Sequence, residues 1–598
     1  MRATPLQGTA HAGTSKIRTG ARPWRPATCA MAILAVLAIP LTAQEEGVAA
    51  PPQNHWPAAT EVGDGAGPVG QALLEEAPTR ESWLHYGGNY ASWRHSPITE
   101  LTPESVSDLR LAWIAQTGVA GQLESSPVVY DGVLYLTSSM NRLLAYDAGD
   151  GSLLWRYDHE NPSDLRICCG PVNRGVGISG DLVVMGTLDA RLLAFNRKTG
   201  ELAWNIEVIP YAKGFSITSA PLIAEGVVVI GIGGGEYGVR GFFDGYDLET
   251  GELLWRHYTV PDTGEAGVET WAGESYKTGG AATWATGSYD PATKTLFWTT
   301  GNPSPDWSGD TRAGDNLYSD SVLAVDIETG ERKWYFQFTP HDVWDYDGNS
   351  EVWLVDVDVN EQSIPALVQA NRNGYFYVLD RRDGSFLHAS QYVHQLNWAT
   401  LDENGRPVVN PAMKPTEEPT QRVCPGLAGG NNAAYAGAYS PDTGLAYVPT
   451  IESCMMFRKG VVVFVEGIPF FGGEPIPTDT AEGKSYGHLS AIDVSTGETR
   501  WTYRDPVPML AGVLSTAGGL VVTGNASGHL LGFDAETGEE VWRYQTGSGI
   551  RSHPIAYEYE GRTYLAVGSG GGGIVQTTVG TAPSLPEGSV LLVFELAQ

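Results

Sequence analysis

One short pattern recurs along most of the chain and constrains the fold more than any other feature. A small residue is followed by Asp, or once by Asn, then by Gly and then by Trp, with the spacing A-x-D-x-x-x-G-x-x-x-W. Each D-x-x-x-G is typical of a tight turn between two strands, because glycine accepts the positive φ that such turns require. Copies of the pattern end at Trp155, Trp204, Trp255, Trp334, Trp501 and Trp542; a weaker copy ends at His388, and Trp113 would close another.

These repeats predict an all-β fold, an eight-bladed β-propeller whose tryptophans fill the seams between neighbouring blades. The 74 glycines and 18 tryptophans, with only 18% charged residues, favour short strands and glycine turns over helices. The segment from Leu591 to Leu596 is expected to pair beside the N-terminal strands. Such pairing would close the ring and leave few exposed sheet edges.

The N-terminus has the features of an export signal. Basic residues precede an apolar run from Ala27 to Ala43, which is short for a membrane span. We therefore predict a signal peptide over residues 1–43, a flexible segment rich in Pro, Ala, Gly and Glu over 44–80, and the propeller over 81–598. The protein would have no stable membrane insertion, although an uncleaved anchor is the alternative. A formal net charge of −32 argues against nucleic acid as a partner and favours a basic protein or a cation.

Four cysteines remain beyond the signal peptide, an even number that suits an oxidising compartment. We expect Cys424 and Cys454 to form a disulfide within the long interval that follows His388. Cys168 and Cys169 are adjacent, and a vicinal bridge between such close Cα atoms would mark a functional site. Two reduced thiols are the alternative. No C-x-x-C-H sequence occurs, so the chain attaches no c-type haem.

The stretch from Gly279 to Asp347 is the strongest candidate for a binding site. Trp284 could cover the face of a planar ligand, and Asn302 offers a neutral oxygen to a cation. Asp345 and Asp347 offer charged oxygens to the same cation. Such a set suits a metal ion held beside a planar cofactor. The alternative is a set of blade tryptophans and Asp-Gly turns without a ligand.

From Trp83 to the C-terminus the chain resembles the pyrroloquinoline quinone (PQQ)-dependent alcohol dehydrogenases of the methanol and ethanol dehydrogenase family. The motifs that carry this resemblance are C-C-x-P-V-N-R-G, G-G-G-E-Y-G-V-R-G, G-N-P, H-D-x-W-D and A-N-R-N-G. The resemblance implies a periplasmic quinoprotein that oxidises an alcohol to its aldehyde by hydride transfer to metal-bound PQQ. Electrons would then pass to a separate c-type cytochrome. The sequence leaves a homodimer open.

The resemblance also implies roles for individual residues. Asp345 would accept the alcohol proton, and Arg372 would stabilise charge on the quinone oxygens. Trp284 would lie on one face of PQQ and a disulfide between Cys168 and Cys169 on the other. The other implied PQQ contacts are Glu124, Arg174, Thr218, Gly234, Gly235 and Asn432, and the implied metal ligands are Glu236, Asn302, Asp345 and Asp347. Taken singly, Glu124, Thr218 and Glu236 could equally be turn or cap residues.

Asp347 bears on the choice of metal. Lanthanide-dependent members of the family resemble the Asp-x-Asp of this chain, whereas calcium-dependent members carry a small neutral residue at that place. Three formal negative charges, from Glu236, Asp345 and Asp347, are balanced better by a trivalent than by a divalent cation. Alternatively, Asp347 caps the turn that follows it.

Two other functions are weighed against a lanthanide enzyme. One is a calcium-dependent quinoprotein acting on a polyol or sugar. The other is a non-catalytic propeller of the outer-membrane assembly type, which would need none of these residues. The loop from Gly568 to Gly580 lacks the tryptophan expected of methanol dehydrogenases, so a methanol-sized pocket is not implied.

Overall fold

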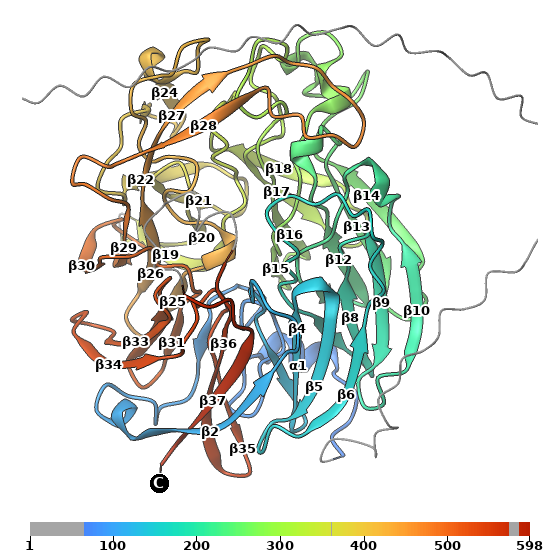
Figure 1. The fold of residues 1–598 in the computed structure, drawn as a ribbon, viewed down its shortest axis with the longest axis vertical. Coiled ribbons are helices and arrows are strands. Elements are labelled where there is room, and N and C mark those ends of the chain that lie inside the picture. Colours follow the sequence, from blue (N-terminus) through green and yellow to red (C-terminus); the bar gives the residue numbers. More distant parts are fainter. Residues whose placement is uncertain (1–64, 360, 573–584, 598) are drawn as a thin grey trace, which may run out of the picture. The chain divides into compact units, whose positions relative to one another are not determined.

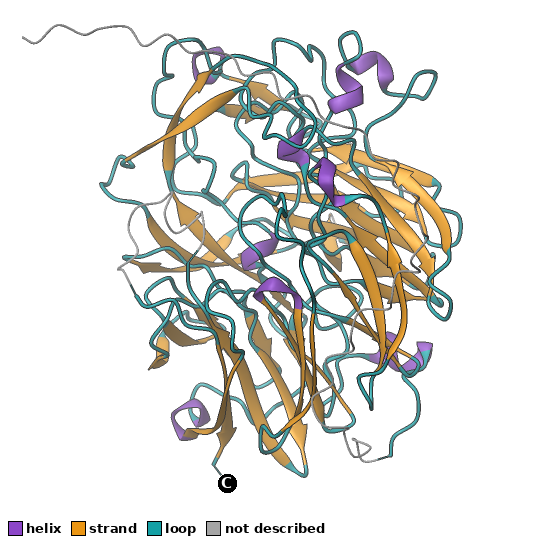
Figure 2. Cartoon of the chain, turned by 45° about the vertical axis from the view of Figure 1, so that its right-hand side comes forward, coloured by secondary structure: helices purple, strands orange, loops and turns teal. Residues whose placement is uncertain are grey.

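The structure, a computed structural model, describes residues 65–359, 361–572 and 585–597. These residues belong to one unit that runs from Asn54 to Gln598, and strands with loops make up nearly all of it (Figures 1 and 2). The predicted signal peptide, the part of the predicted flexible segment before residue 65 and most of the loop from Gly568 to Gly580 lie outside the described residues. Among the residues described, no helix has both the length and the hydropathy to cross a bilayer.

Eight antiparallel sheets follow one another along the chain, which confirms the predicted eight-bladed propeller (Figure 1). Each of the first five blades consists of four consecutive strands. Their bounds are β3 (Val128–Tyr130), β4 (Val133–Ser138), β5 (Arg142–Asp147), β6 (Leu153–Asp158), β7 (Gly177–Ser179), β8 (Leu182–Gly186), β9 (Arg191–Asn196), β10 (Leu202–Glu207), β11 (Leu222–Ala224), β12 (Val227–Gly231), β13 (Phe242–Asp247), β14 (Leu253–Tyr258), β15 (Ser288–Asp290), β16 (Thr295–Thr299), β17 (Ser321–Asp326), β18 (Arg332–Gln337), β19 (Trp353–Val359), β20 (Gln362–Ala370), β21 (Tyr375–Asp380) and β22 (Phe386–Gln391).

The last three blades complete the ring. Their strands are β25 (Ala438–Ser440), β26 (Leu445–Glu452), β29 (Tyr486–Asp493) and β30 (Thr499–Asp505); then β31 (Leu514–Thr516), β32 (Leu520–Gly524), β33 (His529–Asp534) and β34 (Glu540–Gln545), beside which β1 (His95–Ser96) lies parallel; and finally β35 (Ile555–Tyr559), β36 (Arg562–Ser569), β37 (Val590–Leu596) and β2 (Leu109–Gln116). As expected from the sequence, the C-terminal strand β37 pairs with the N-terminal strand β2. This pairing closes the ring.

The tryptophan of the repeat joins one blade to the next. The indole N–H of Trp155 donates to the backbone oxygen of Arg197 in the following blade at 3.1 Å. A Cβ atom at Gly200 would lie only 2.7 Å from the Trp155 ring, so glycine alone lets the ring lie against the turn. Equivalent indole hydrogen bonds are made by Trp204, Trp255, Trp334 and Trp501. The recurring glycine is therefore required for space as well as for its positive φ of 70°.

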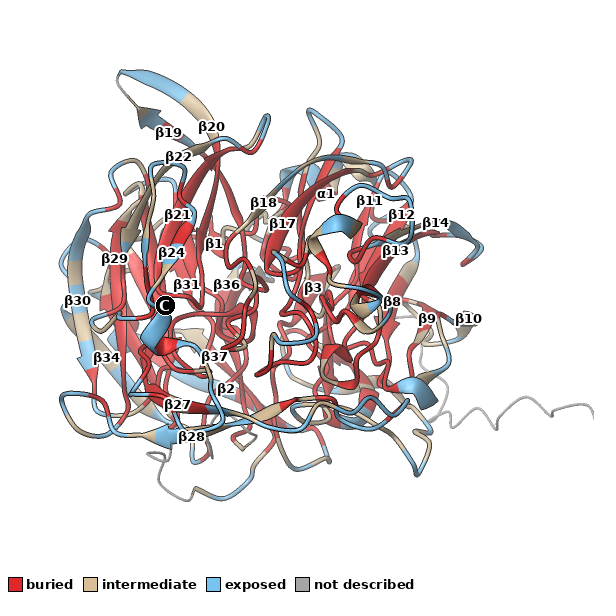
Figure 3. Ribbon diagram, turned by 90° about the horizontal axis from the view of Figure 1, so that it is seen from above, coloured by how far each residue is buried: buried red, intermediate tan, exposed pale blue. Residues whose placement is uncertain are grey.

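The inner strands of the blades are buried and the outer strands are exposed (Figure 3). Every residue of β3, β7 and β11 is buried, whereas the fourth strands, such as β10 and β30, carry exposed residues. First strands of successive blades also lie against one another, as β7 does against β11 and β25 against β31. The loops that lead into the first strands therefore converge on the centre of the ring.

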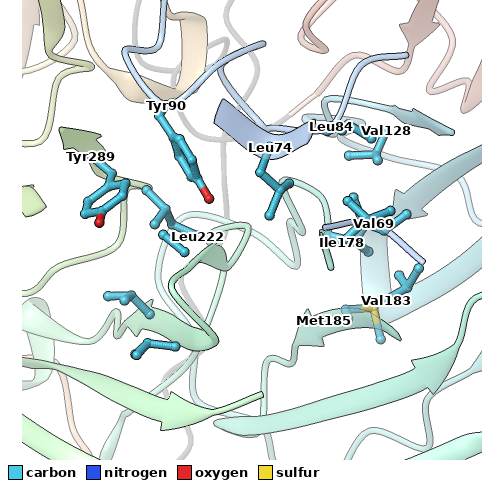
Figure 4. Close-up of a cluster of buried hydrophobic side chains, with 14 of the residues drawn as sticks. Val69, Leu74, Leu84, Tyr90, Val128, Ile178, Val183, Met185, Leu222 and Tyr289 are labelled. Atoms are coloured by element: carbon cyan, nitrogen blue, oxygen red, sulfur yellow. The ribbon is translucent and has the colours of Figure 1, made fainter. Parts of the chain in front are cut away.

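The N-terminal part of the described chain is folded. Residues 65–80 were expected to belong to a flexible segment, but they contain the helix α1 (Gln71–Glu76) and two side chains that are only 1% exposed, Val69 and Leu74. Leu74 packs into a cluster with Tyr90 and Leu222 (Figure 4). Burial of these two apolar side chains offsets the entropy lost on ordering the segment.

Two small sheets and several short helices lie outside the blades. The interval after His388 contains a hairpin of β23 (Ala399–Leu401) with β24 (Pro407–Val409) and another of β27 (Cys454–Lys459) with β28 (Gly473–Thr478). A disulfide joins Cys424 to Cys454, which confirms the predicted pair. The 3-10 helices are η1 (Ser105–Asp108), η2 (Ser139–Asn141), η3 (Tyr211–Lys213), η4 (Gly235–Tyr237), η5 (Val268–Thr270), η6 (Ser275–Thr278), η7 (Pro411–Met413) and η8 (Ala433–Tyr435).

Candidate active site

Three of the predicted site residues occupy the same position of the repeat. Glu124, Thr218 and Trp284 each lie four residues before the first strand of their blade, which is β3, β11 or β15. Because the first strands line the centre of the ring, this position brings side chains from separate blades together. Arg551 has the same position before β35, and sequence reasoning missed it. The signal that could have found it is the recurrence of Glu-Ser-Ser-Pro and Thr-Ser-Ala-Pro as Arg-Ser-His-Pro.

The first set of site residues is rich in arginine, and we call Glu124, Arg174, Thr218 and Arg551 the arginine group. The Glu124 carboxylate, 2% exposed, lies 2.9 Å from Arg174 Nη2 and is also paired with Arg551. Arg174 Nη1 donates to the hydroxyl of Thr218 at 2.8 Å, and its guanidinium lies 4.9 Å from the ring centroid of Trp284. Two guanidinium groups thus face one carboxylate. Their Nε atoms find no hydrogen-bond acceptor in the described part of the chain.

The vicinal disulfide is present, as the sequence predicted. Cys168 is bonded to Cys169, and both sulfur atoms lie within 4.8 Å of a carboxylate oxygen of Glu236. Cys168 and Trp284 also pack at the edge of one hydrophobic cluster, which contains Ala282. The disulfide, the tryptophan and the acidic residues therefore belong to one site. The placement of a planar cofactor between Cys168–Cys169 and Trp284 stays a prediction.

The loop that contains Asp345 and Asp347 is held in place by the residues between them and before them, Tyr346, Trp344 and Asp342. The carboxylate of Asp342 accepts the backbone N–H groups of Trp344 at 2.8 Å and of Tyr346 at 2.6 Å. Trp344 and Tyr346 are fully buried in a hydrophobic cluster. Asp345, which lies between these two aromatic residues, and Asp347, which follows them, have left-handed backbone conformations with φ of 63° and 54°. Aspartate tolerates this conformation better than most residues, and strained backbone of this kind is common at functional sites.

Both aspartates contact Arg372, the arginine of the A-N-R-N-G motif, which lies just after β20. Arg372 Nη1 donates to the backbone oxygen of Asp345 at 2.9 Å and to Asp347 Oδ2 at 3.1 Å. The backbone N–H of Asn302 donates to Asp347 Oδ1 at 3.1 Å. The Asp347 carboxylate thus binds two groups distant in sequence instead of capping its own turn. The side-chain Nδ2 of Asn302 is buried and has no partner among the described residues.

Glu236 completes the predicted metal-binding set. It lies in η4 between Gly234 and Gly238, both with positive φ, and a Cβ atom at Gly234 would lie 2.2 Å from the backbone oxygen of Gly214. Burial raises the pKa of Glu236 to about 7, and the charge of Asp347 acts in the same direction. Burial, followed by the neighbouring Asp347, raises the pKa of Asp345 well above its ordinary value. A bound cation would favour the ionised forms of these carboxyl groups.

Asp306 is a further acidic residue of this site that sequence reasoning missed. It is 1% exposed, and neither of its carboxylate oxygens has a hydrogen-bond partner in the described chain. Burial raises its pKa well above the ordinary value, and the largest charge effect comes from Glu236. Asp306 follows Asn302 by four residues in N-P-S-P-D, and this proximity was the available signal. We call Glu236, Asn302, Asp306, Asp345 and Asp347 the acidic group.

Two remaining predicted contacts have other partners in the structure. The side-chain oxygen of Asn432 accepts the backbone N–H of Ala434 at 2.9 Å and so caps η8. Its amide group would still offer N–H donors to a ligand. The backbone oxygen of Gly235 accepts the hydroxyl of Ser304. Contacts of Asn432, Gly234 and Gly235 with a cofactor stay predictions.

The two groups fit an anionic planar cofactor and a cation held side by side. The arginine group offers guanidinium groups with unpartnered N–H donors to carboxylates. The acidic group offers four carboxyl groups and one neutral amide to a hard cation. Arg372 lies beside Asp345 and Asp347, and the buried Arg312 lies near Asp306. Carboxyl groups without partners are costly in a buried site, so a cation is the expected complement.

Comparisons with known proteins agree with this arrangement. Residues 83–395 match the family model described as "Glucose/ethanol/alcohol dehydrogenase, beta-propeller domain", and residues 455–580 match that of "Outer membrane protein assembly factor BamB". Quinoprotein alcohol dehydrogenase PedH of Pseudomonas putida is 38% identical over 84% of this chain and 89% of its own length.

Two relatives are named for their metal. The lanthanide-dependent methanol dehydrogenase of Methylacidiphilum fumariolicum is 35% identical over 84% of this chain and 86% of its own. The solved structure of a europium-containing methanol dehydrogenase has a TM-score of 0.83 and 33% identity, and the match covers 88% of this chain and all of that one.

Proposed function

This chain belongs to the family of PQQ-dependent alcohol dehydrogenases, and from this premise we propose that its arginine and acidic groups hold PQQ and a lanthanide ion at the centre of the ring. The observation that carries the proposal is the acidic group, in which two buried carboxyl groups, of Asp306 and Asp347, lie near two partly buried ones, of Glu236 and Asp345. Trp284 connects the two groups, because the Arg174 guanidinium lies over its ring and Asp347 lies beside its side chain. The residues therefore supply both parts of the expected site, the cofactor-binding part and the metal-binding part.

In the proposed mechanism, Asp345 is the general base. Its carboxylate accepts the proton of the alcohol hydroxyl, while Arg372 holds the backbone of Asp345 and the side chain of Asp347 in position. Arg174 and Arg551 would bind and orient the carboxylates of the cofactor, and Trp284 with the vicinal disulfide would shield its faces from water. PQQ, when bound beside the metal ion, supplies the acceptor for the hydride of the alcohol carbon.

The charge of the acidic group supports a trivalent metal. Glu236, Asp345 and Asp347 are the carboxylates expected from the sequence, and Asp306 adds a fourth. A lanthanide balances this charge better than Ca²⁺ does, since both are hard cations that take oxygen ligands. The names of two relatives, one lanthanide-dependent and one containing europium, are consistent with this choice.

The hairpin of β27 and β28 favours an alcohol with an apolar substituent over a polyol or sugar. In its connecting loop, the backbone N–H of Phe470 donates to the backbone oxygen of Glu236 at 2.6 Å, and the Phe464 and Phe470 rings lie against Gly238. From the same loop, the backbone oxygen of Phe471 accepts the backbone N–H of Trp307 at 2.9 Å. Aromatic side chains thus lie directly beside the loop of the proposed metal ligand Glu236. We propose that these rings contact an alkyl or aromatic group of the substrate.

The compartment and the electron acceptor follow from the whole chain. A predicted signal peptide and two disulfides suit the periplasm. Because the chain lacks a C-x-x-C-H sequence, we propose that electrons leave to a separate c-type cytochrome. The net charge of −32 would attract a basic carrier.

Reconstitution tests the metal assignment. Apoprotein is supplied with PQQ and with La³⁺, Ca²⁺ or no metal, and dye-linked oxidation of linear alcohols and of glycerol is measured. We expect activity with La³⁺, little with Ca²⁺, and a preference for linear alcohols. Activity with Ca²⁺ alone would instead support the calcium alternative.

Asp347→Ala gives a sharper test of the same assignment. Loss of one of the carboxylates should abolish activity supported by La³⁺ and leave whatever activity Ca²⁺ supports. Circular dichroism and retention of PQQ report whether the variant is folded. Equal activity of variant and parent with La³⁺ would rule out a role of Asp347 in lanthanide selection.

A further inference from the structure

A second cluster of metal-ligating side chains lies in the sixth blade, apart from the acidic group. Glu452 ends β26, His488 belongs to β29, and His394 lies in the loop after β22. One potential ligand atom from each of the three residues lies within 4.8 Å of the others. In a tetrahedral zinc site with bonds of about 2.1 Å, ligand atoms are separated by about 3.4 Å, so a modest closure would complete the site.

The register of the sheet fixes two of the three ligands. Thr450 pairs with His488 and Glu452 with Tyr486 across β26 and β29, so Glu452 and His488 are diagonal neighbours on one face. His488 Nε2 lies 3.1 Å from Glu452 Oε1. Both side chains are buried, with exposed fractions of 3% for Glu452 and 0% for His488. Burial lowers the pKa of His488, which favours the neutral imidazole that binds metals.

The third ligand approaches from solvent. His394 is exposed, its ring stacks on His488 with centroids 4.4 Å apart, and its Nδ1 is 2.9 Å from the hydroxyl of Tyr486. The backbone N–H of His394 also donates to Glu452 Oε1 at 2.7 Å, which anchors the loop beside the carboxylate. A small adjustment of this exposed ring would direct Nε2 at an ion while Nδ1 stays beside the Tyr486 hydroxyl. With Nε2 on the ion, Nδ1 would carry the proton and donate it to the Tyr486 hydroxyl, which would fix the tautomer as an outer acceptor does for other metal-binding histidines.

We propose that His394, Glu452 and His488 bind a divalent transition metal ion such as Zn²⁺, with water as a further ligand. Two imidazoles and one carboxylate suit Zn²⁺ better than they suit La³⁺ or Ca²⁺, because La³⁺ and Ca²⁺ select oxygen ligands. The site is therefore separate in chemistry from the acidic group, and it does not depend on the proposed function.

Such an ion would brace the loop that supports Arg372. Tyr392, two residues before His394, donates its hydroxyl to the backbone oxygen of Asn371 at 2.7 Å and accepts the N–H of Asn431 at 2.8 Å. Cys454 of the disulfide follows Glu452 by two residues. The ion would thus join the loop after β22, the disulfide-linked segment and the sixth blade. Its expected effect is on stability and not on the chemical step.

The test uses the full chain incubated with excess PQQ and La³⁺, so that La³⁺ competes with Zn²⁺ at the acidic group; the variants below assign the zinc to this cluster whether or not PQQ binds. After incubation with micromolar Zn²⁺ and gel filtration, we expect one zinc per chain by elemental analysis. Zn²⁺ should also raise the unfolding temperature, because it binds only the folded chain. Substitution of Co²⁺ should give the visible absorption of a site with imidazole and carboxylate ligands.

His394→Asn is the decisive variant, because His394 is exposed and its loss should leave the fold intact. We expect Zn²⁺ affinity to fall by at least about tenfold, and Glu452→Gln should have the same effect. His529→Asn, which changes a histidine of the seventh blade beside Gln545, is the matched control and should retain zinc. Absence of zinc from the parent chain, or equal affinity in the parent and in His394→Asn, would overturn the proposal.

Discussion

The arginine group and the acidic group lie side by side at the centre of one ring, yet they differ in how far the protein itself satisfies their charges. In the arginine group, Glu124 pairs with Arg174 and Arg551, and Thr218 accepts a further hydrogen bond. In the acidic group, Arg372 reaches two of the aspartates, while both oxygens of Asp306 lack a partner within the described chain.

This difference indicates how each half is prepared for its ligand. The arginine group is largely organised by its own ion pairs, so a ligand adds carboxylates to guanidinium groups that are already positioned. The acidic group contains buried and partly buried carboxyl groups whose pKa values are raised, so it carries an electrostatic penalty that a cation would remove. We therefore expect substitutions in the acidic group to change function more than those in the arginine group.

The largest effect is expected for Asp345→Asn, which removes the proposed base but keeps the shape of the side chain. General-base catalysis typically contributes about 10²–10⁴-fold, so kcat should fall by that factor. Dye-linked alcohol oxidation measures the change, with bound PQQ and metal determined on the same sample. Asp315→Asn, which alters a partly exposed carboxylate paired with Arg406, is the control. Turnover retained by Asp345→Asn would remove Asp345 from the mechanism.

A smaller effect is expected for Asp306→Asn, which should weaken metal binding but stabilise the metal-free protein. Lanthanide affinity should fall by about 10–100-fold, as for residues that support metal ligands. The metal-free protein should become more stable, because the variant removes a buried carboxyl group without a partner. Terbium luminescence titration and denaturant unfolding measure the two quantities. Unchanged terbium affinity would show that Asp306 does not contribute to the metal site of the acidic group.

The smallest effect is expected for Arg551→Gln. Glu124 keeps its ion pair with Arg174, so the variant loses one charged donor and PQQ affinity should fall by about tenfold. Titration of apoprotein with PQQ, followed by fluorescence, gives the affinity. Arg543→Gln, in which the altered arginine is exposed and pairs with Glu540, is the control. If Arg551→Gln reduced activity more than Asp345→Asn, the contrast between the two groups would be wrong.

Much of the fold was predictable because it is encoded locally. The D-x-x-x-G turn and the following tryptophan are repeated in most of the blades, and the same glycine that forms the turn accepts the tryptophan of the preceding blade, as Gly200 accepts Trp155. The count of eight blades and the closing strand followed from this repeat, and both disulfides followed from the number and positions of the cysteines. The ordering of residues 65–80 did not, since it depends on where Val69 and Leu74 find apolar partners.

The site shows the same division. The sequence by itself determined the candidate residues Glu236, Asn302, Asp345, Asp347 and Arg372, because each belongs to a short motif with a recognisable pattern. Only the tertiary structure brought Arg551 to Glu124 and left Asp306 buried without a partner in the described chain. Contacts of this kind join residues up to hundreds of positions apart, and burial depends on every neighbouring segment. A local pattern can specify a blade, but the charge balance at the centre of the ring is set only when all eight blades meet.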